Sequence, residues 1–428
     1  MKNPIKLVGL LGALAIVATA CGPAASPSPT AGPGTSTTPA TAAPPTEAPS
    51  TALKGELTLW HSYGSGGGET GALDQVLGAV RAQNPELTIT VVEQPFADIF
   101  NKWQTDVLAG EETPDLFIAP NDNLFSQADA GALANLNDKL AGKLDGFAQV
   151  AVDGSKADIG DGKGPQFYMV PESLKAVALW YDKTAVATAP ATTADLLAAV
   201  QSGAVKLGLN QNAYHMFGFS GAFGGKLLDG GKCVADQAGF ADAFKYFADL
   251  KAAGAKFYTD GNALKQDFQT GKLNAVIDGP WQTADFTTAF AELGHELAVA
   301  PIPAGPSGGK ANPFTGTDGW YINPNSPNVD LAVQFALIMV GTTWEQIFVN
   351  FAGHVPAAPG VTIADPIVQG FADAAAAGLP RPQSAEFGTY WGPFGDAVNK
   401  VVDTSADPTA TITNACKLMN DAIALLPK

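Results

Sequence analysis

The first stretch whose residue types could do chemistry is a glycine-rich loop, His-Ser-Tyr-Gly-Ser-Gly-Gly-Gly-Glu over residues 61–69. Glycines at this density permit left-handed backbone angles and let a ligand approach the main chain. The loop lacks both a dinucleotide-binding spacing and the Gly-Lys-Ser/Thr of a phosphate-binding loop, so we do not expect it to cradle phosphate. Ser62 and Glu69 flank the glycines. We predict that they contact a ligand, with simple solvent exposure as the alternative.

Catalytic and metal-binding motifs are missing from the sequence. It contains no HExxH, GxSxG or Cys-His constellation. The histidines at positions 61, 215, 295 and 354 are dispersed and do not show metal-ligand spacing. We therefore predict no catalytic residue, no metal and no cofactor. His61 and His215 lie next to other candidates and could touch a ligand.

The elements on either side must position this loop. Apolar residues alternate with polar ones at 57–59 and predict a strand ending at Trp60. Apolar residues at helical spacing follow over 73–80, and residues 87–92 complete a β-α-β unit. Ligands of such units bind at the carboxyl ends of the strands, so Trp60 and the loop are candidates for a binding site. Packing in the core is the alternative for Trp60.

Strands and helices continue to alternate along the chain. Further strands are predicted within 114–123, 167–181 (broken at Pro171), 206–209, 275–281, 297–301 and 320–322. Further helices are predicted at 99–108, 124–133, 193–201, 240–253, 329–340 and 411–426. Residues 210–225 are rich in glycine and aromatic residues, and no element is predicted there. The pattern indicates an α/β protein with two lobes.

The N-terminal residues indicate export. Lys2 and Lys6 precede an apolar run at 7–17, so residues 1–20 are predicted to be a signal peptide. Cys21 then resembles the lipidated cysteine of a bacterial lipoprotein; an ordinary secretory cleavage is the alternative. Residues 21–54 are mostly Ala, Pro, Ser, Thr and Gly, which predicts a disordered tether. We expect a protein anchored to the outer face of the cell membrane through its lipid alone.

Composition limits the possible partners. The formal net charge of −17 becomes −19 when Lys2 and Lys6 are removed, which argues against nucleic acid or anionic lipid as a partner. Roughly 370 residues follow the tether, and 46% of the chain is hydrophobic, enough for two domains. In an oxidising compartment Cys233 and Cys416 are expected to form a disulfide, with two buried thiols as the alternative. We expect a monomer.

Six sequence blocks resemble one known family. In chain order they are LTLWHSYG, TPDLFIAPNDNLFSQADAGALANL, VPESLKAVALWYDK, AVIDGPW, PFTGTDGWYINPNSPN and SAEFGTYWGPFGDAV. Together they resemble the extracellular solute-binding proteins of ABC importers, specifically the maltose/maltodextrin-binding type. The resemblance covers residues 55–428 and implies a two-lobed periplasmic-binding-protein fold of type II. In such a fold the ligand binds in the cleft between the lobes and draws them closed by a hinge motion.

The resemblance also implies where the chain crosses between lobes. Residues 55–171 and 317–356 would form the N-terminal lobe, and residues 172–316 and 357–428 the C-terminal lobe. Glu172, Asp318 and Trp320 lie at the implied crossovers and are candidate cleft residues. Solvent exposure is the alternative for Glu172, and packing in the hinge is the alternative for Asp318 and Trp320.

A sugar-binding cleft needs two kinds of side chain. Aromatic rings cover the apolar faces of a sugar, while carboxylate, amide and guanidinium groups hydrogen-bond its hydroxyls. By resemblance, Tyr214, Trp281 and Trp391 occupy stacking positions, with core packing as the alternative for each. Asn121 and Asp122 align with a loop that grips hydroxyls. Their neighbour Asn123 replaces a basic residue of the family's maltose binder and could instead cap the next helix.

These residues predict a substrate-binding lipoprotein of an ABC importer. It would capture an oligosaccharide resembling maltose or maltodextrin outside the cell and deliver it to transmembrane permease subunits, without catalysing a reaction. The same fold with another cargo, such as another disaccharide, a polyamine or a small cation, is an alternative. Charged cargo needs charged clamps, and Lys175 is the nearest cation to the candidates. A lipid-anchored glycoside hydrolase is a further alternative, and needs two carboxylates roughly 5–9 Å apart across the sugar.

Overall fold

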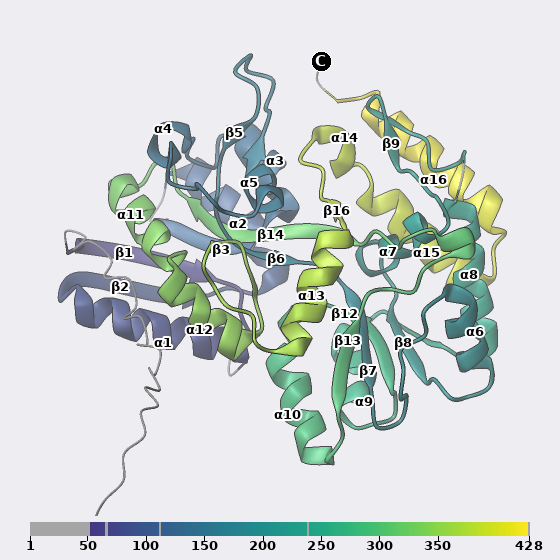
Figure 1. Ribbon diagram of the computed structural model, residues 1–428. Helices are drawn as coiled ribbons and strands as arrows, with labels where there is room; N and C mark the ends of the chain where they lie inside the picture. Colours follow the sequence, from purple (N-terminus) through teal and green to yellow (C-terminus); the bar gives the residue numbers. More distant parts are fainter. Residues whose placement is uncertain (1–51, 65–66, 111–112, 238, 427–428) are drawn as a thin grey trace, which may run out of the picture. The chain divides into compact units, whose positions relative to one another are not determined.

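The computed structural model describes residues 52–64, 67–110, 113–237 and 239–426 (Figure 1). The predicted signal peptide, Cys21 and nearly all of the tether lie outside these residues. Strands and helices alternate as predicted, and the α/β fold class is confirmed. Two predicted helices, α6 (Thr193–Gln201) and α8 (Phe240–Ala253), have the expected bounds.

Seven strands of the described chain form the first sheet. The strands are β1 (Lys54–His61), β2 (Glu86–Glu93), β3 (Leu116–Pro120), β6 (Val170–Lys175), β14 (Phe314–Ile322), β15 (Val355–Pro356) and β16 (Leu379–Pro380). Their order is β15-β6-β14-β3-β1-β2, and β16 pairs with β14. The first three strands are parallel, whereas β14 runs antiparallel to both β3 and β6. Every residue of β14 is buried, because this strand lies in the middle of the sheet.

Five other strands form the second sheet. They are β7 (Ala178–Asp182), β8 (Leu207–Asn210), β11 (Lys256–Tyr258), β12 (Ala275–Asp278) and β13 (Leu297–Ala300), in the order β11-β8-β12-β7-β13. The chain passes from the first sheet to the second through the two residues between β6 and β7. Two short hairpins lie outside the main sheets: β4 (Lys156–Ala157) with β5 (Gln166–Phe167), and β9 (Leu228–Asp229) with β10 (Lys232–Cys233).

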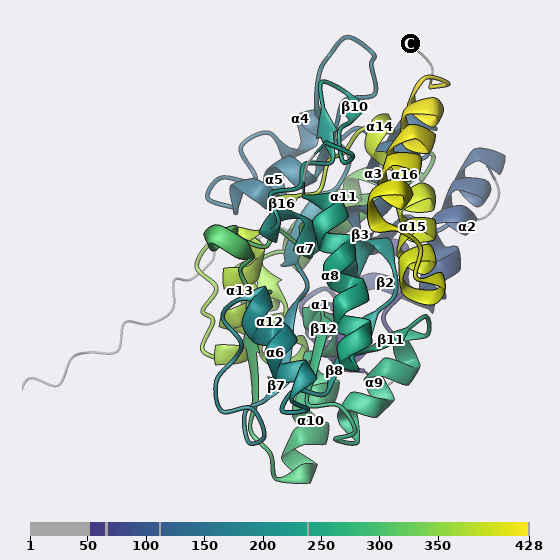
Figure 2. The ribbon, with the colours of Figure 1, turned by 90° about the vertical axis from the view of Figure 1, so that its right-hand side faces the viewer.

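Helices cover both faces of each sheet (Figures 1 and 2), which explains why the strands are apolar on both sides. On the first sheet these are α1 (Gly68–Gln83), α11 (Val329–Met339) and α12 (Thr342–Ala352) on one face and α2 (Phe96–Ala109) and α3 (Leu124–Asp129) on the other. One face of the second sheet is covered by five helices: α6, α7 (Ala213–Ala222), α8, α15 (Trp391–Thr404) and α16 (Pro408–Ile423). The opposite face is covered by α9 (Gly261–Gln269), α10 (Thr283–Leu293) and α13 (Pro366–Ala377). Three short helices are α4 (Asn137–Leu140), α5 (Gln149–Gly154) and α14 (Ala385–Gly388).

Several predicted boundaries were wrong. The predicted break at Pro171 lies inside β6, and the chain leaves the first sheet only after Lys175. The strand tolerates this proline because it pairs with Gly319, where the register between β6 and β14 shifts. The helix predicted over 124–133 ends at Asp129, before Gly131 adopts a left-handed φ of 73°. The strand predicted at 320–322 begins at Phe314.

A helix that we did not predict, α7, lies within residues 210–225. Asn212 caps it: the side-chain oxygen of Asn212 accepts a hydrogen bond from the backbone N–H of His215, 2.9 Å away. Most residues of α7 are buried on all sides, so the helix has no amphipathic pattern to predict it.

The three glycines of the loop that the structure describes do not adopt the left-handed angles that we expected. Gly67 is extended, with φ −81° and ψ 171°, and Gly64 and Gly68 are not left-handed either. Gly68 is instead a point of close approach. A Cβ atom there would lie 2.4 Å from the Cβ of Ala284 in α10 and 2.8 Å from the carbonyl oxygen of Phe351 in α12. The first turn of α1 therefore packs between helices from both sheets.

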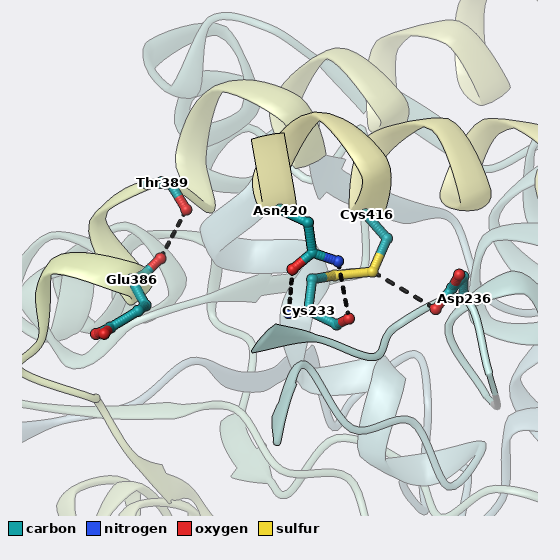
Figure 3. The surroundings of a disulfide bond; sticks show 6 residues. All are labelled: Cys233, Asp236, Glu386, Thr389, Cys416 and Asn420. Atoms are coloured by element: carbon teal, nitrogen blue, oxygen red, sulfur yellow. Dashed lines mark hydrogen bonds between the residues drawn. A yellow bond between two sulfur atoms is a disulfide. The ribbon is translucent and has the colours of Figure 1, made fainter. Parts of the chain in front are cut away.

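A disulfide joins Cys233 to Cys416, as predicted (Figure 3). It links the β9–β10 hairpin to α16. The side chain of Asn420 strengthens the same contact, because its oxygen accepts a hydrogen bond from the backbone N–H of Cys233 and its amide donates one to the carbonyl.

No single helix of the described chain is both long and apolar enough to cross a membrane; α11 and α12, which meet at a bend of 61°, satisfy the length and composition requirement only as a pair.

We expect the disulfide to stabilise the fold chiefly by restricting the unfolded chain. Its sequence separation of 183 residues closes a long loop, for which the chain-entropy contribution is about 4–5 kcal/mol. The variant carrying Cys233→Ser and Cys416→Ser should therefore unfold at a lower guanidinium concentration. Reductant should lower the midpoint of the wild type and leave that of the variant unchanged. An unchanged wild-type midpoint, with both thiols shown to be free, would contradict this account.

Candidate functional site

Three half-buried aromatic rings gather at the edge of the hydrophobic core between the second sheet and helices α7, α8 and α15. Tyr214 and Trp391 both pack on Phe314, with ring centroids 6.5 Å and 6.0 Å away, and Tyr214 lies 6.2 Å from Trp281. These are the three aromatic residues that we predicted to stack on a ligand. Because each ring packs on the core and remains partly exposed, it can present apolar surface to a ligand.

A short turn positions one of these rings, that of Trp281. Trp281 follows β12 in a 3-10 turn (Pro280–Gln282). The indole needs Gly279 beside it, because a Cβ atom there would lie 2.1 Å from the ring. His215 packs edge-on against Trp281, and its Nε2 lies 3.4 Å from the Asp278 carboxylate. His215 is thus part of the support for Trp281.

Two predicted site residues, Asn121 and Asp122, lie in the polar loop after β3 and differ in how far they are buried. Asn121 is fully buried: its amide donates to the carbonyl of Gly154 at 2.9 Å, and its side-chain oxygen accepts from the N–H of Thr317 at 3.2 Å. Since both ends of its side chain are occupied, we leave Asn121 out of the ligand site. The side chain of Asp122 is 31% exposed and remains a candidate. Asn123 makes no capping hydrogen bond, so that alternative was wrong.

Arg381 is a neighbour of Asp122 that sequence reasoning missed. It follows β16 directly, is only 5% exposed, and forms an ion pair with Asp122. Its guanidinium also lies over the ring of Tyr214, 5.2 Å from the centroid. Burial lowers the pKa of Arg381 to about 9, which leaves the side chain charged at neutral pH. No local pattern around Arg381 signals this contact with a loop near residue 122.

Three predicted carboxylates belong to a buried chain of alternating charges. The Glu69 oxygen Oε1 accepts from Lys175 Nζ at 2.8 Å and from His354 Nε2 at 3.0 Å. Lys175 also binds Asp318 at 2.7 Å, and Nδ1 of His354 lies 2.7 Å from Glu172. We call these five residues the charge chain. Since carboxylates face both ring nitrogens of His354, the imidazole is held in its doubly protonated, cationic form.

The charge chain shifts the pKa of its members. Burial alone would lower the pKa of His354, but Glu172 and Glu69 outweigh it and raise that pKa to about 9. Burial alone would raise the pKa of Glu69, but Lys175 and His354 lower it to about 2. The neighbouring carboxyl of Glu345 has a raised pKa because of burial and its proximity to Glu172.

The charge chain changes the interpretation of the predicted crossover residues. Glu172 and Asp318 are almost fully buried and bind protein cations, so we assign them to the packing of β6 and β14 rather than to a ligand. Glu69 is half-buried and could still reach a ligand with its other oxygen. Lys175, the cation nearest to the predicted site residues, is buried among these carboxylates and does not face solvent.

Two predicted tryptophans lie in the core of the first sheet. Trp60 packs edge-on against Trp103, 6.4 Å between centroids, and Lys102 lies over its ring. Trp320 is fully buried and packs against Phe335. A ligand cannot stack on either buried ring, so both are corrections to the predicted site. Ser62 is half-buried on the loop after β1 and stays a candidate.

Metal-ligand groups and surface pockets are further places to look for a site in the described chain. No group of three or more His, Cys, Asp or Glu side chains is arranged to hold a metal among the described residues. Two surface pockets lie elsewhere: one between α7, α8 and the segment around Pro306, the other between the start of β1 and α11.

Comparison with known proteins identifies the family. The sequence profile of the family described as bacterial extracellular solute-binding protein matches residues 78–378 of the chain. The chain belongs to this family of bacterial extracellular solute-binding proteins. Because the family consists of binding proteins, this solute-binding protein is not an enzyme, and the hydrolase alternative falls away.

The solute-binding protein is similar to several proteins with established names. The maltotriose-binding protein of Pyrococcus abyssi is 25% identical over 371 residues, which cover 81% of this chain and 78% of that one. A maltooligosaccharide ABC transporter solute-binding lipoprotein of Streptococcus pneumoniae serotype 4 is 24% identical over 338 residues, covering 72% and 76%. The structure of the Thermus thermophilus maltotriose binding protein bound with maltotriose matches with a TM-score of 0.76 and 26% identity, covering 86% of this chain and all of that one. This match confirms the two-lobed fold.

We expect the charge chain to make the solute-binding protein less stable in alkali. The pKa of His354 is about 9 in the folded protein, against an ordinary value of 6.5. The stabilisation that protonated His354 gives the fold is therefore complete below pH 6.5 and is lost as the pH rises through 9. The free energy of unfolding should fall by roughly 3 kcal/mol over this range. Urea unfolding of wild type and His354→Gln at several pH values measures it.

The variant provides the control for this prediction. His354→Gln should be less stable than wild type at pH 6.5, because it leaves Glu172 and Glu69 without their cation. It should also lose much less stability between pH 6.5 and pH 9. Parallel losses in the two proteins would show that His354 does not cause the pH dependence.

Proposed function

We propose that this protein captures an α-linked glucose oligosaccharide, such as maltose or a maltodextrin, and delivers it to the permease of an ABC importer. The observation that carries the proposal is the set of three half-buried rings, Tyr214, Trp281 and Trp391. One of them, Tyr214, lies beside the guanidinium of Arg381, which pairs with Asp122. Rings and paired polar groups match the two surfaces of a neutral sugar. The named ligands of the similar proteins, maltotriose and maltooligosaccharides, support the same class.

The charges around the site favour a neutral ligand over a polyamine or small cation. All four predicted carboxylates are already paired with protein cations: Asp122 with Arg381, Glu69 and Asp318 with Lys175, and Glu172 with His354. A cationic ligand would have to compete with these pairs. Hydroxyl groups can share a paired carboxylate, because its oxygens accept more than one hydrogen bond.

The ligand site belongs to a hinged pair of lobes in this proposal. Each lobe would be built around one of the two sheets, and the connections between Lys175 and Ala178 and between β13 and β14 would be two of the crossovers. The first lobe boundary would then lie after Lys175 instead of after residue 171. The second would lie before Phe314 instead of before residue 317. Ser62, Glu69 and Asp122 would face the three rings across the cleft, and the protein would work as a monomer.

The location outside the cell follows from the family, and the anchor is our proposal. Residues 1–20 would direct export, lipidation of Cys21 would hold the protein on the outer face of the cell membrane, and residues 21–54 would act as the tether. The similar protein of Streptococcus pneumoniae is named a lipoprotein, which supports this arrangement.

Ligand titration tests the binding proposal. Tryptophan fluorescence and melting temperature would be followed with maltose, maltotriose and longer maltodextrins, and with sucrose, cellobiose, spermidine and phosphate for comparison. At 100 times its dissociation constant a true ligand adds about 2.7 kcal/mol of stability. Trp281→Ala and Trp391→Ala should each weaken maltodextrin binding about tenfold or more, because a stacking ring is lost.

The control for these variants is Trp344→Ala, which removes a partly buried tryptophan from α12, away from the three rings. It should bind the sugar as the wild type does. A response to spermidine or phosphate alone would overturn the sugar assignment.

The proposed anchor predicts where the protein is found. Cys21→Ser should leave no site for the lipid, so the protein should move from the membrane fraction to the medium or the soluble extracytoplasmic fraction. Metabolic labelling with a fatty acid provides the second readout, and should mark the wild type but not Cys21→Ser. Unchanged membrane association with no label on either protein would exclude the lipid anchor.

A further inference from the structure

The burial of Arg381 is not explained by a gain in the stability of the fold. The sequence contains only two arginines, and the other, Arg81, is exposed on α1. Moving a guanidinium out of water is unfavourable, and a single buried ion pair seldom repays the loss of hydration. The guanidinium Nε of Arg381 also has no hydrogen-bond acceptor among the described residues. An unsatisfied buried donor of this kind is unusual in a folded protein, so we looked for a role for Arg381 in the contacts that it makes.

Arg381 contacts residues that we assign to opposite sides of the ligand site. Asp122 lies in the 3-10 turn (Asn121–Asn123) that follows β3 of the first sheet. Tyr214 lies in the first turn of α7, which packs in the hydrophobic core of the second sheet. The guanidinium pairs with the Asp122 carboxylate and lies over the Tyr214 ring. One side chain thus touches a proposed hydrogen-bonding residue and a proposed stacking residue.

The backbone around Arg381 is fixed to the same elements. Its N–H donates to the carbonyl of Thr315 in β14 at 3.0 Å, and the Gln383 side chain donates to the carbonyl of Asn121 at 2.9 Å. Gly316 leaves room for the guanidinium, because a Cβ atom there would lie 2.9 Å from Nη2 of Arg381. The position of the guanidinium is therefore set by the sheet and by this glycine.

We propose that Arg381 is a positioning residue that sets the orientation of Asp122 and Tyr214 for the sugar. Asp122 is held through Oδ1, which leaves its other carboxylate oxygen for a ligand hydroxyl. Tyr214 is held from one side by the cation, so its orientation is fixed before the sugar arrives. The proposal rests on the proposed function, since it describes how that site is organised.

A double-mutant cycle tests this coupling. Maltotriose dissociation constants would be measured for Arg381→Met, Asp122→Asn and the double variant, with the melting temperature of each ligand-free protein. Each single change should weaken binding about tenfold or more, and the double variant should be little weaker than the worse single one. Arg381→Lys should bind with intermediate affinity, because lysine keeps the charge but not the planar fork. Arg81→Met, the matched control, should bind as the wild type does.

A second variant moves the guanidinium without changing any charge. Gly316→Ala forces Arg381 away from its place and should weaken maltotriose binding, whereas Gly71→Ala, where a Cβ meets open space, should not. Wild-type affinity in both Arg381→Lys and Gly316→Ala would overturn the proposal. So would fully additive losses in the cycle, because Arg381 would then not act through Asp122.

The same measurements separate this proposal from the proposed function. If the wild type binds no maltodextrin, the proposed function fails before any variant is compared. If the wild type binds maltotriose and the Arg381 variants bind it equally well, only the positioning role fails.

Discussion

The charge chain Glu172–His354–Glu69–Lys175–Asp318 is the interaction on which the rest of the site depends. It joins β6, β14, the first turn of α1 and the residue before β15, all beside the place where the chain leaves the first sheet. Removing one partner from a buried ion pair typically costs about 3–5 kcal/mol, so these elements are held in one register. The two residues that connect β6 to β7 therefore follow a residue, Lys175, whose position is fixed by its ion pairs.

The same charge chain determines what the surface of the site can offer. The carboxylates of β6 and β14 already bind Lys175 and His354, so a cationic ligand would have to compete with those contacts. What remains accessible is aromatic surface from Tyr214, Trp281 and Trp391. The side chains of Asp122, Glu69 and Ser62 are also partly exposed. Rigid rings lose little conformational freedom when they bind, which suits recognition of a ligand without charge.

Local signals in the sequence predicted part of this arrangement. The β-α-β start, most helices and the three half-buried aromatics follow from periodicity, turn residues and family resemblance. The charge chain could not be predicted in this way, because its pairs are separated along the sequence by 106, 182 and 285 positions. No local pattern indicates which carboxylate meets which cation. The contacts of Arg381 were not predicted either, because its partners Asp122 and Tyr214 are also distant in the sequence. The α7 helix had a local signal in its Asn212 cap, which the apolar character of the segment obscured.

The order of strands has a consequence for how the chain can be made. Strand β14 lies between β3 and β6 in the middle of the first sheet, yet it comes from residues 314–322. Until those residues have emerged, β3 and β6 have no partner between them, although both were synthesised long before. Such late, long-range pairing gives a high contact order and slow folding. The first sheet therefore closes only after the strands of the second have already been produced.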